Sequence, residues 1–254
     1  MPTPVEFMQR YRNLKVNAVI EDPVRRVCVM NTFTVQLKKY FMMKWSAGTE
    51  ELSDYTTVTS GPNKDQWFLT NKDRIRAAAM GKGAPEDYEL ALEWAVRSKK
   101  IKTPDQTTLQ AFCDEHLGID CSGFVTNYLA ACGKLPYSFS TVVNTSAASY
   151  FKPHKAVNDP LDVRQGDILV WMQGNAVMRN PGHVAVVEHY FPYSDKGGTM
   201  KVVEATGAAG ANPKLLDSMY TVEQIIPKGG SAPAMILVVK RHGVSGSRVC
   251  VMRY

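Results

Sequence analysis

Asp120-Cys121-Ser122-Gly123-Phe124-Val125 is the stretch that decides the predicted fold, because it places a cysteine where a loop turns into a helix. The residues that follow, 126–132, carry apolar side chains at spacings of three and four, which is typical of a short amphipathic helix, and a glycine ends it. Free N–H groups and the positive end of the helix dipole favour a thiolate at such a helix start. The sequence therefore predicts that Cys121 is a nucleophile.

A candidate base lies downstream, in the segment Gly-His-Val-Ala-Val-Val at residues 182–187. Because a glycine precedes His183 and β-branched residues follow it, we expect His183 to open a strand. A second strand, predicted over 200–205, carries Glu204 in an apolar setting. If the two strands form an antiparallel hairpin, Glu204 can accept a hydrogen bond from His183. Cys121, His183 and Glu204 then have the roles of nucleophile, base and orienting acid.

Three motifs in this order resemble those of the NlpC-type cell-wall peptidases, a papain-like family. They are the block at 120–125, a Gly-Asp pair followed by apolar residues within 165–171, and Gly-His-Val at the start of 182–187. The resemblance covers roughly the second half of the chain. It implies a papain-like α+β fold in which the helix bearing Cys121 packs against an antiparallel β-sheet bearing His183 and Glu204.

One position departs from the family pattern. The third catalytic residue of the family is commonly a second histidine or an amide, whereas this sequence has Glu204 there, which is similar to the related CHAP amidases. Either kind of side chain can accept the N–H of the histidine. The resemblance implies hydrolysis of an amide in a stem or crosslink peptide of peptidoglycan: Cys121 attacks the carbonyl, His183 transfers the proton, and water releases the thioester.

Two neighbours of the cysteine have expected supporting roles. Asp120 is a typical N-cap residue, so we expect its carboxylate to cap the helix rather than react. The backbone N–H of Cys121 or Ser122 can supply part of an oxyanion hole. In the second motif, we expect Asp167 to be structural and Trp171 to lie in the core or to line the substrate groove.

Each candidate also has a structural interpretation. Cys121 can be a small buried core residue, as free cysteines usually are, and His183 can be a structural histidine. Glu204 can be a solvated strand residue or one half of a surface ion pair. His189 has the same parity as His183 along the strand, which makes it a second candidate base.

The composition restricts the cofactors and partners. Five cysteines without paired spacing indicate a chain made in a reducing compartment, without a disulfide framework. Cys113 and His116 precede Cys121, but their spacing fits no common zinc pattern, so we expect neither a metal nor another cofactor. The net charge is +6, yet the basic residues are scattered and no nucleic-acid-binding motif is present. We therefore expect no nucleic acid partner.

The character of the sequence changes near residue 100. Residues 101–254 have about the length of the family's core, and we expect them to form the papain-like cysteine hydrolase domain. Residues 1–100 are expected to be an additional region, which can be a cap over the groove, a targeting piece or an elaborated lobe. Within them a helix is predicted over 87–99, and Thr103-Pro104-Asp105 is a typical helix start.

The sequence also motivates expectations about location. No apolar stretch of signal-peptide length begins the chain, and none approaches the roughly 20 residues of a membrane span. A wall hydrolase without an export signal needs another route, so we expect an antibacterial effector delivered by contact-dependent (type VI) secretion to the periplasm of a target cell. An immunity protein or a secretion-machine carrier would be its partner. A phage lysin is the alternative.

The same three residues fit other functions. They would serve a protease, a deamidase or an acyltransferase that acts on a protein. In a different class, an inactive relative would only bind wall peptides or another protein. Alkylation of Cys121 by iodoacetamide well below pH 8, faster than that of the other four cysteines, would indicate an enzyme, whereas uniform slow labelling would favour such a binding module.

Overall fold

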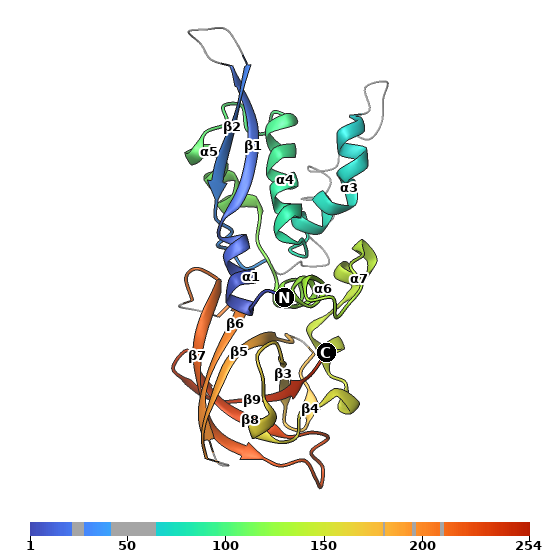
Figure 1. The fold of residues 1–254 in the computed structure, drawn as a ribbon, viewed down its shortest axis with the longest axis vertical. Coiled ribbons are helices and arrows are strands. Elements are labelled where there is room, and N and C mark those ends of the chain that lie inside the picture. Colours follow the sequence, from blue (N-terminus) through green and yellow to red (C-terminus); the bar gives the residue numbers. More distant parts are fainter. Residues whose placement is uncertain (22–27, 42–64, 180, 195–196, 209–210) are drawn as a thin grey trace.

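The computed structural model describes residues 1–21, 28–41, 65–179, 181–194, 197–208 and 211–254. Two layers of structure follow one another along the long axis of the molecule (Figure 1). One end holds most of the helices and a two-stranded sheet, and the other end holds a β-barrel. Helices α1 and α6 lie between these two ends.

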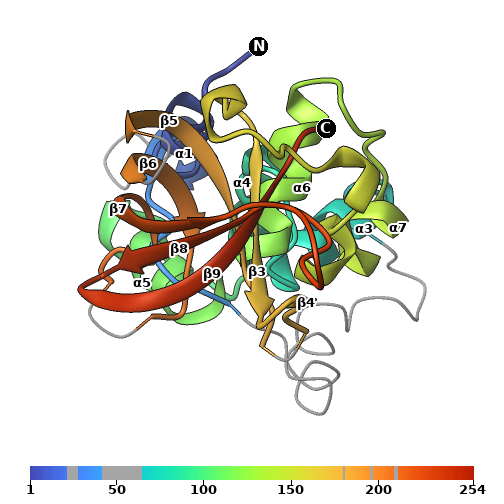
Figure 2. The ribbon, with the colours of Figure 1, turned by 90° about the horizontal axis from the view of Figure 1, so that it is seen from below.

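The barrel is formed by antiparallel strands that are neighbours in space in the order β3, β5, β6, β7, β8 and β9. Figure 2 shows it from the end that lies opposite the helices. A short strand, β4, pairs only with the end of β3. The bounds of the strands are β3 (Ile168–Gln173), β4 (Ala176–Val177), β5 (Val184–Ser194), β6 (Gly197–Ala205), β7 (Leu215–Ile226), β8 (Ile236–Arg241) and β9 (Val244–Met252).

The predicted papain-like α+β fold, in which the helix bearing Cys121 packs on an antiparallel β-sheet, is wrong, because the sheet is a closed barrel. Strand β9 pairs with β8 on one side and with β3 on the other, where Ile168 lies opposite Met252 and Met172 lies opposite Arg248. This second pairing closes the sheet into a six-stranded barrel without a free edge. Alternation along a strand shows which face is buried but not which strand is its partner, so the sequence pattern could not reveal the closure.

Side chains of the barrel strands alternate between two hydrophobic clusters. In β3, Leu169 and Trp171 point into the barrel interior, whereas Ile168 and Val170 belong to the cluster that the helices cover. Successive side chains of a strand point to opposite faces. Both faces of β3 are therefore buried, which explains why this strand is an uninterrupted apolar run rather than an alternating one.

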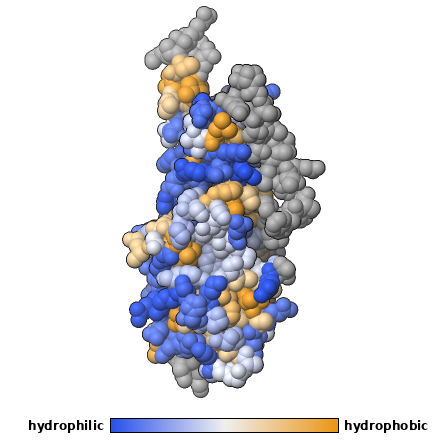
Figure 3. Space-filling view, turned by 90° about the vertical axis from the view of Figure 1, so that its right-hand side faces the viewer, coloured by the Kyte–Doolittle hydropathy of each residue, from blue (hydrophilic) through white to orange (hydrophobic). Residues whose placement is uncertain are grey.

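The other end of the molecule consists of helices around a β-hairpin. Strands β1 and β2 pair antiparallel from Leu14 opposite Val35 to Glu21 opposite Cys28. Val19, Val29 and Met30 are exposed near the end of this hairpin, where Figure 3 shows apolar atoms in orange. The bounds are α1 (Pro4–Tyr11), β1 (Leu14–Glu21), β2 (Cys28–Val35), α3 (Gln66–Ala79), α4 (Pro85–Arg97), α5 (Gln106–His116), α6 (Cys121–Ala131) and α7 (Phe139–Asn144), with 3₁₀ turns at Ala147–Tyr150, Pro153–Lys155 and Pro160–Asp162.

The predicted helices are confirmed, with shifted ends. The helix expected over 87–99 is α4, which starts at Pro85 because proline is favoured in a first turn. The start expected at Thr103-Pro104-Asp105 is the N-cap of α5, where the Asp105 carboxylate accepts hydrogen bonds from two backbone N–H groups. None of the helices in the described part of the chain is long and apolar enough to cross a membrane.

Residues on both sides of position 100 share one hydrophobic cluster. The rings of Phe7 and Tyr11 on α1 lie 5.8 and 6.0 Å from the ring of Phe124 on α6. The Tyr11 hydroxyl also donates to the carbonyl of Gly83, at 3.0 Å. The expected role of residues 1–100 as a cap or a targeting piece stays a prediction, but their side chains help to hold the helix that carries the cysteine.

Candidate active site

Cys121 is the first residue of α6, and its neighbours explain why the helix begins there. Asp120 has an extended backbone conformation and accepts a hydrogen bond from the backbone N–H of Gly123 through its carboxylate. It is therefore the N-cap that the sequence predicts. The Cys121 side chain is thereby placed at the positive end of the helix dipole, where the structure leaves the residue 4% exposed.

The structure brings His183 and Glu204 together. Strands β5 and β6 form the predicted antiparallel pair, with Val186 opposite Val203. Nε2 of His183 lies 2.9 Å from Oε2 of Glu204. The Glu204 side chain is fully buried and that of His183 is 12% exposed. Because Nε2 is the N–H that donates to Glu204, Nδ1 is the ring nitrogen that can accept a proton from a thiol.

The charges at the site shift the pKa values of both residues. Burial alone lowers the pKa of His183, but hydrogen bonds and charge from Cys121 and Glu204 outweigh burial, and the net pKa lies above the ordinary value. Burial alone raises the pKa of Glu204, but its hydrogen bonds to His183 and His242 and the charge of Arg241 hold it well below the ordinary value. Glu204 is therefore ionised, and it favours the protonated form of His183.

Arg241 and His242, at the turn between β8 and β9, complete the surroundings of Glu204. The guanidinium of Arg241 donates to Oε2 of Glu204 and to the Thr206 hydroxyl. His242 places Nε2 3.0 Å from Oε1 of the same carboxylate. Neither residue belongs to the three sequence motifs, so no signal along the sequence indicated them.

One short contact in this cluster is not a hydrogen bond. Nη2 of Arg241 lies 3.1 Å from Nε2 of His183. Both atoms carry an N–H when His183 donates to Glu204, so neither can accept from the other. The two groups are donors that converge on the same carboxylate oxygen. Their closeness means that Glu204 compensates two positive charges once His183 is protonated.

Trp171 is buried in the core, as one of the two expectations had it, and it also contacts the His183 imidazole. Its ring centroid lies 4.4 Å from that of His183 in an edge-to-face arrangement, and the guanidinium of Arg241 lies over the indole at 5.1 Å. Both contacts restrict the directions in which the charged side chains can move. Trp171 thus holds the His183 imidazole and the Arg241 guanidinium beside Glu204 in fixed positions.

Tyr40 is a site residue that sequence reasoning missed. It follows β2, and its hydroxyl lies 3.7 Å from Sγ of Cys121. Burial and the nearby Cys121 and Asp120 raise the pKa of Tyr40, so the hydroxyl keeps its proton. The ring packs against Gly207, where a Cβ would lie 3.1 Å from it. A neutral O–H donor is thereby aimed at the atom that would react.

The remaining sequence candidates lie outside this cluster or support it. The Ser122 hydroxyl is buried and donates to Asp120, so it is not free to react. Asp167 accepts hydrogen bonds from the Arg253 guanidinium, which agrees with the structural role expected for it. His189 is exposed beyond an irregularity in the β5–β6 register, and its ring lies 3.9 Å from that of Phe191. His189 is therefore turned away from the site.

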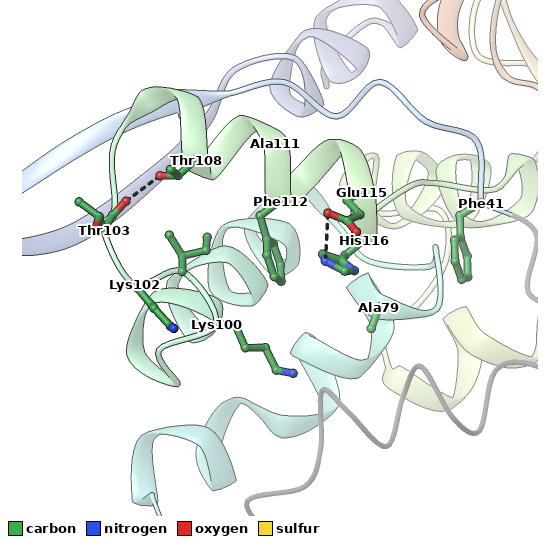
Figure 4. Close-up of a pocket in the computed structure, with 11 residues that line it drawn as sticks. Phe41, Ala79, Lys100, Lys102, Thr103, Thr108, Ala111, Phe112, Glu115 and His116 are labelled. Atoms are coloured by element: carbon green, nitrogen blue, oxygen red, sulfur yellow. Dashed lines mark hydrogen bonds and ion pairs between the residues drawn. The ribbon is translucent and has the colours of Figure 1, made fainter.

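His116 also lies away from the site. It faces Glu115 in a pocket of about 810 Å³ that Phe41, Lys100 and Phe112 help to line (Figure 4). The lining of this pocket does not include Cys121 or its proposed partners. Within the part of the chain that the structure describes, no three His, Cys, Asp or Glu side chains gather in a way that could hold a metal ion.

Comparison with known proteins adds no relative from which a role could be transferred. No family model matches the chain, and neither the curated proteins nor the solved structures give a significant match. The function must therefore be argued from the geometry of the site and from the three sequence motifs.

Proposed function

We propose that this protein is a cysteine hydrolase that cleaves an amide bond through Cys121, His183 and Glu204. The observation that carries the proposal is the His183–Glu204 pair, with Nε2 and Oε2 2.9 Å apart, whose imidazole also interacts with Cys121 at the N-terminus of α6. A nucleophile, a base and a group that orients the base are the three parts that amide hydrolysis by a thiol needs.

In the proposed reaction His183 accepts a proton and returns it twice, once while the thioester forms and once while it is hydrolysed. His183 takes the proton of Cys121, and the thiolate attacks the carbonyl carbon. The Tyr40 hydroxyl and backbone N–H groups at the start of α6 donate to the oxyanion. His183 then protonates the leaving amine, and the acyl group stays on the sulfur as a thioester. Water, deprotonated by His183, attacks the thioester and releases the acid and the thiol.

We propose peptide amides of bacterial peptidoglycan as the substrate class. The resemblance of three ordered motifs to those of the NlpC-type wall peptidases supports this choice, with Glu204 in the manner of the CHAP amidases. The net charge of +6 also suits an anionic wall polymer. The closed barrel differs from the predicted papain-like architecture, but the three motifs and the contacts of Cys121, His183 and Glu204 do not depend on that architecture.

Mass spectrometry of purified peptidoglycan digested with the protein tests this substrate. We expect new muropeptide fragments with the wild type and none with Cys121→Ala, because alanine removes the thiol that is the proposed nucleophile. The position is 4% exposed, so the substitution makes little change to the surface. His189→Ala is the matched control and should release the same fragments as the wild type. If the folded wild type leaves peptidoglycan intact, the substrate is instead a protein or the site only binds.

We also propose that the protein acts in the periplasm of a target bacterium, as an effector delivered by contact-dependent (type VI) secretion. The support is that the proposed substrate lies across a membrane from the cytoplasm. We expect expression with a fused signal peptide to stop growth and expression without it to be harmless, measured as optical density. Cys121→Ala should be harmless in both compartments. Equal toxicity in both compartments would contradict a wall target.

A further inference from the structure

A loop from the first half of the chain is hydrogen-bonded to the start of α6. The loop, residues 81–83, joins α3 to α4. Its Gly81 carbonyl accepts from the backbone N–H of Asp120 at 3.0 Å, and the Asn127 side chain donates to the carbonyls of Lys82 and Gly83. A Cβ on Gly123 would collide with the Gly81 carbonyl. The glycine of the Cys-Ser-Gly sequence is therefore needed to let this loop approach.

The loop places a nearly buried ammonium group beside the nucleophile. Lys82 is 9% exposed, and its Nζ lies 2.7 Å from Oδ2 of Asp120. The same ammonium donates to the Ser122 hydroxyl and to the Thr145 carbonyl, at 3.2 Å for the latter. An ammonium withdrawn from water in this way needs such partners. Both carboxylate oxygens of Asp120 are consequently in use, one by Lys82 and one by the helix N-terminus.

The negative charge of Asp120 disfavours a thiolate at the neighbouring Cys121. An aspartate is a good N-cap, but it places a negative charge on the residue directly before Cys121. A like charge disfavours the ionised thiol. The ion pair with Lys82 cancels that charge inside a largely buried cluster, where solvent screens it weakly. The carboxylate can then cap the helix without opposing the nucleophile.

We propose that Lys82 is a positioning residue that neutralises Asp120 and thereby keeps Cys121 reactive as a thiolate. This inference rests on the proposed function, because it assigns Lys82 to the same nucleophile. It also gives residues 1–100 a direct part in the site. Lys82 acts through Asp120 and does not touch the substrate.

Other ionisable groups face Cys121 from the elements packed around it, and the test must leave them unchanged. The Tyr40 hydroxyl approaches from the segment after β2, and His183 approaches from the start of β5. Tyr150 belongs to a 3₁₀ turn, and burial is the main cause of its raised pKa, with a smaller contribution from the charge of Cys121. Glu204, with its own partners, stands behind the imidazole. The test therefore changes only Lys82 and Asp120, which form the ion pair beside Cys121.

The test is the pH dependence of iodoacetamide alkylation at Cys121, measured in the full chain by peptide mass spectrometry. All five cysteines are free thiols. Burial raises the pKa of Cys113 and of Cys250 to about 12, so they should label slowly, whereas the exposed Cys28 is an internal reference. The variants are Lys82→Met, Asp120→Asn, the double variant and Lys82→Arg. Lys201→Met, which removes a partly exposed lysine from its ion pair with Asp217 on the barrel, is the matched control.

The expected result is a pair of opposite shifts that cancel. In Lys82→Met, Asp120 is left uncompensated, so the pH of half-maximal labelling should rise by about one unit. In Asp120→Asn, Lys82 is left uncompensated and the midpoint should fall, while asparagine still caps the helix. The double variant and Lys82→Arg should return close to the wild type. The Lys201→Met control should not shift.

Two outcomes separate this inference from the proposed function. If wild-type Cys121 is reactive at low pH and neither single variant moves the midpoint, Lys82 is only structural and the inference is overturned. If wild-type Cys121 labels no more readily than Cys28, the proposed function is overturned, whereas opposite shifts in the single variants would still establish the electrostatic coupling. Should Lys82→Met not fold, an unchanged midpoint in Asp120→Asn overturns the inference by itself.

Discussion

Replacing His183 with alanine is expected to lower the rate of the proposed peptidoglycan hydrolysis by about 1,000-fold or more, because the same imidazole is the proposed base and the proposed acid. Nε2 of His183 lies 2.9 Å from Oε2 of Glu204, and Glu204 and Cys121 raise the pKa of His183 above its ordinary value despite burial. Without it, no group is left in the proposed reaction to take the proton of the Cys121 thiol or to protonate the leaving amine. Release of muropeptide fragments with time measures the rate.

A matched control and a second readout accompany the His183 variant. His189→Ala removes an exposed histidine from the same strand, β5, and should leave the rate unchanged. In His183→Ala, alkylation of Cys121 should also require a higher pH than in the wild type, since the imidazolium that favours the thiolate is gone. Full activity in a folded His183→Ala protein would show that another group is the base.

Glu204→Gln is expected to cost both activity and stability. Glutamine has nearly the shape of glutamate but no charge, so it cannot favour the imidazolium form of His183. Arg241 and His242 also lose their negatively charged partner, because both contact the Glu204 carboxylate, which is fully buried in the wild type. Removing one member of a buried ion pair typically destabilises a protein by about 3–5 kcal/mol. Urea unfolding would measure the loss of stability, and fragment release would measure the loss of activity.

The double variant Glu204→Gln/Arg241→Met separates the two effects. Methionine removes the unpaired cation, so much of the free energy of unfolding should return, whereas hydrolysis should stay impaired. Stability that does not recover would mean that the guanidinium contacts to Thr206 and Trp171 matter more than the charge of Glu204. Unimpaired hydrolysis in Glu204→Gln would contradict the orienting role.

The same cluster fixes the sign of the pH dependence of stability. The pKa of Glu204 is lowered in the folded state, so its contribution is present above its unfolded pKa of about 4.3 and is lost as the pH falls through the folded value. The pKa of His183 is raised, so its contribution is present below about 6.5 and is lost as the pH rises through the folded value. In Glu204→Gln, the decrease in Tm that accompanies protonation of Glu204 at acid pH should be absent, and Tm measured against pH would show this.

The local part of the site could be predicted from the sequence. Asp120 caps a helix, Cys121 begins it, and the strands that follow His183 and contain Glu204 pair side by side. Each of these features depends on residues close together in the chain. A cap residue, a glycine before β-branched residues and a short separation between two strands are visible without any tertiary information.

The surroundings of these residues depended on the tertiary structure. Arg241 and His242 reach Glu204 from the turn between β8 and β9, in a barrel that closes only when β9 pairs with β3. Tyr40 and Lys82 reach Cys121 and Asp120 from the first 100 residues. Contacts of this kind join residues that are far apart in the chain and follow no period, so no pattern along the sequence carries them. The three candidate catalytic residues could be chosen from the sequence alone because local motifs mark them, whereas the charges that surround them come from the packing of distant segments.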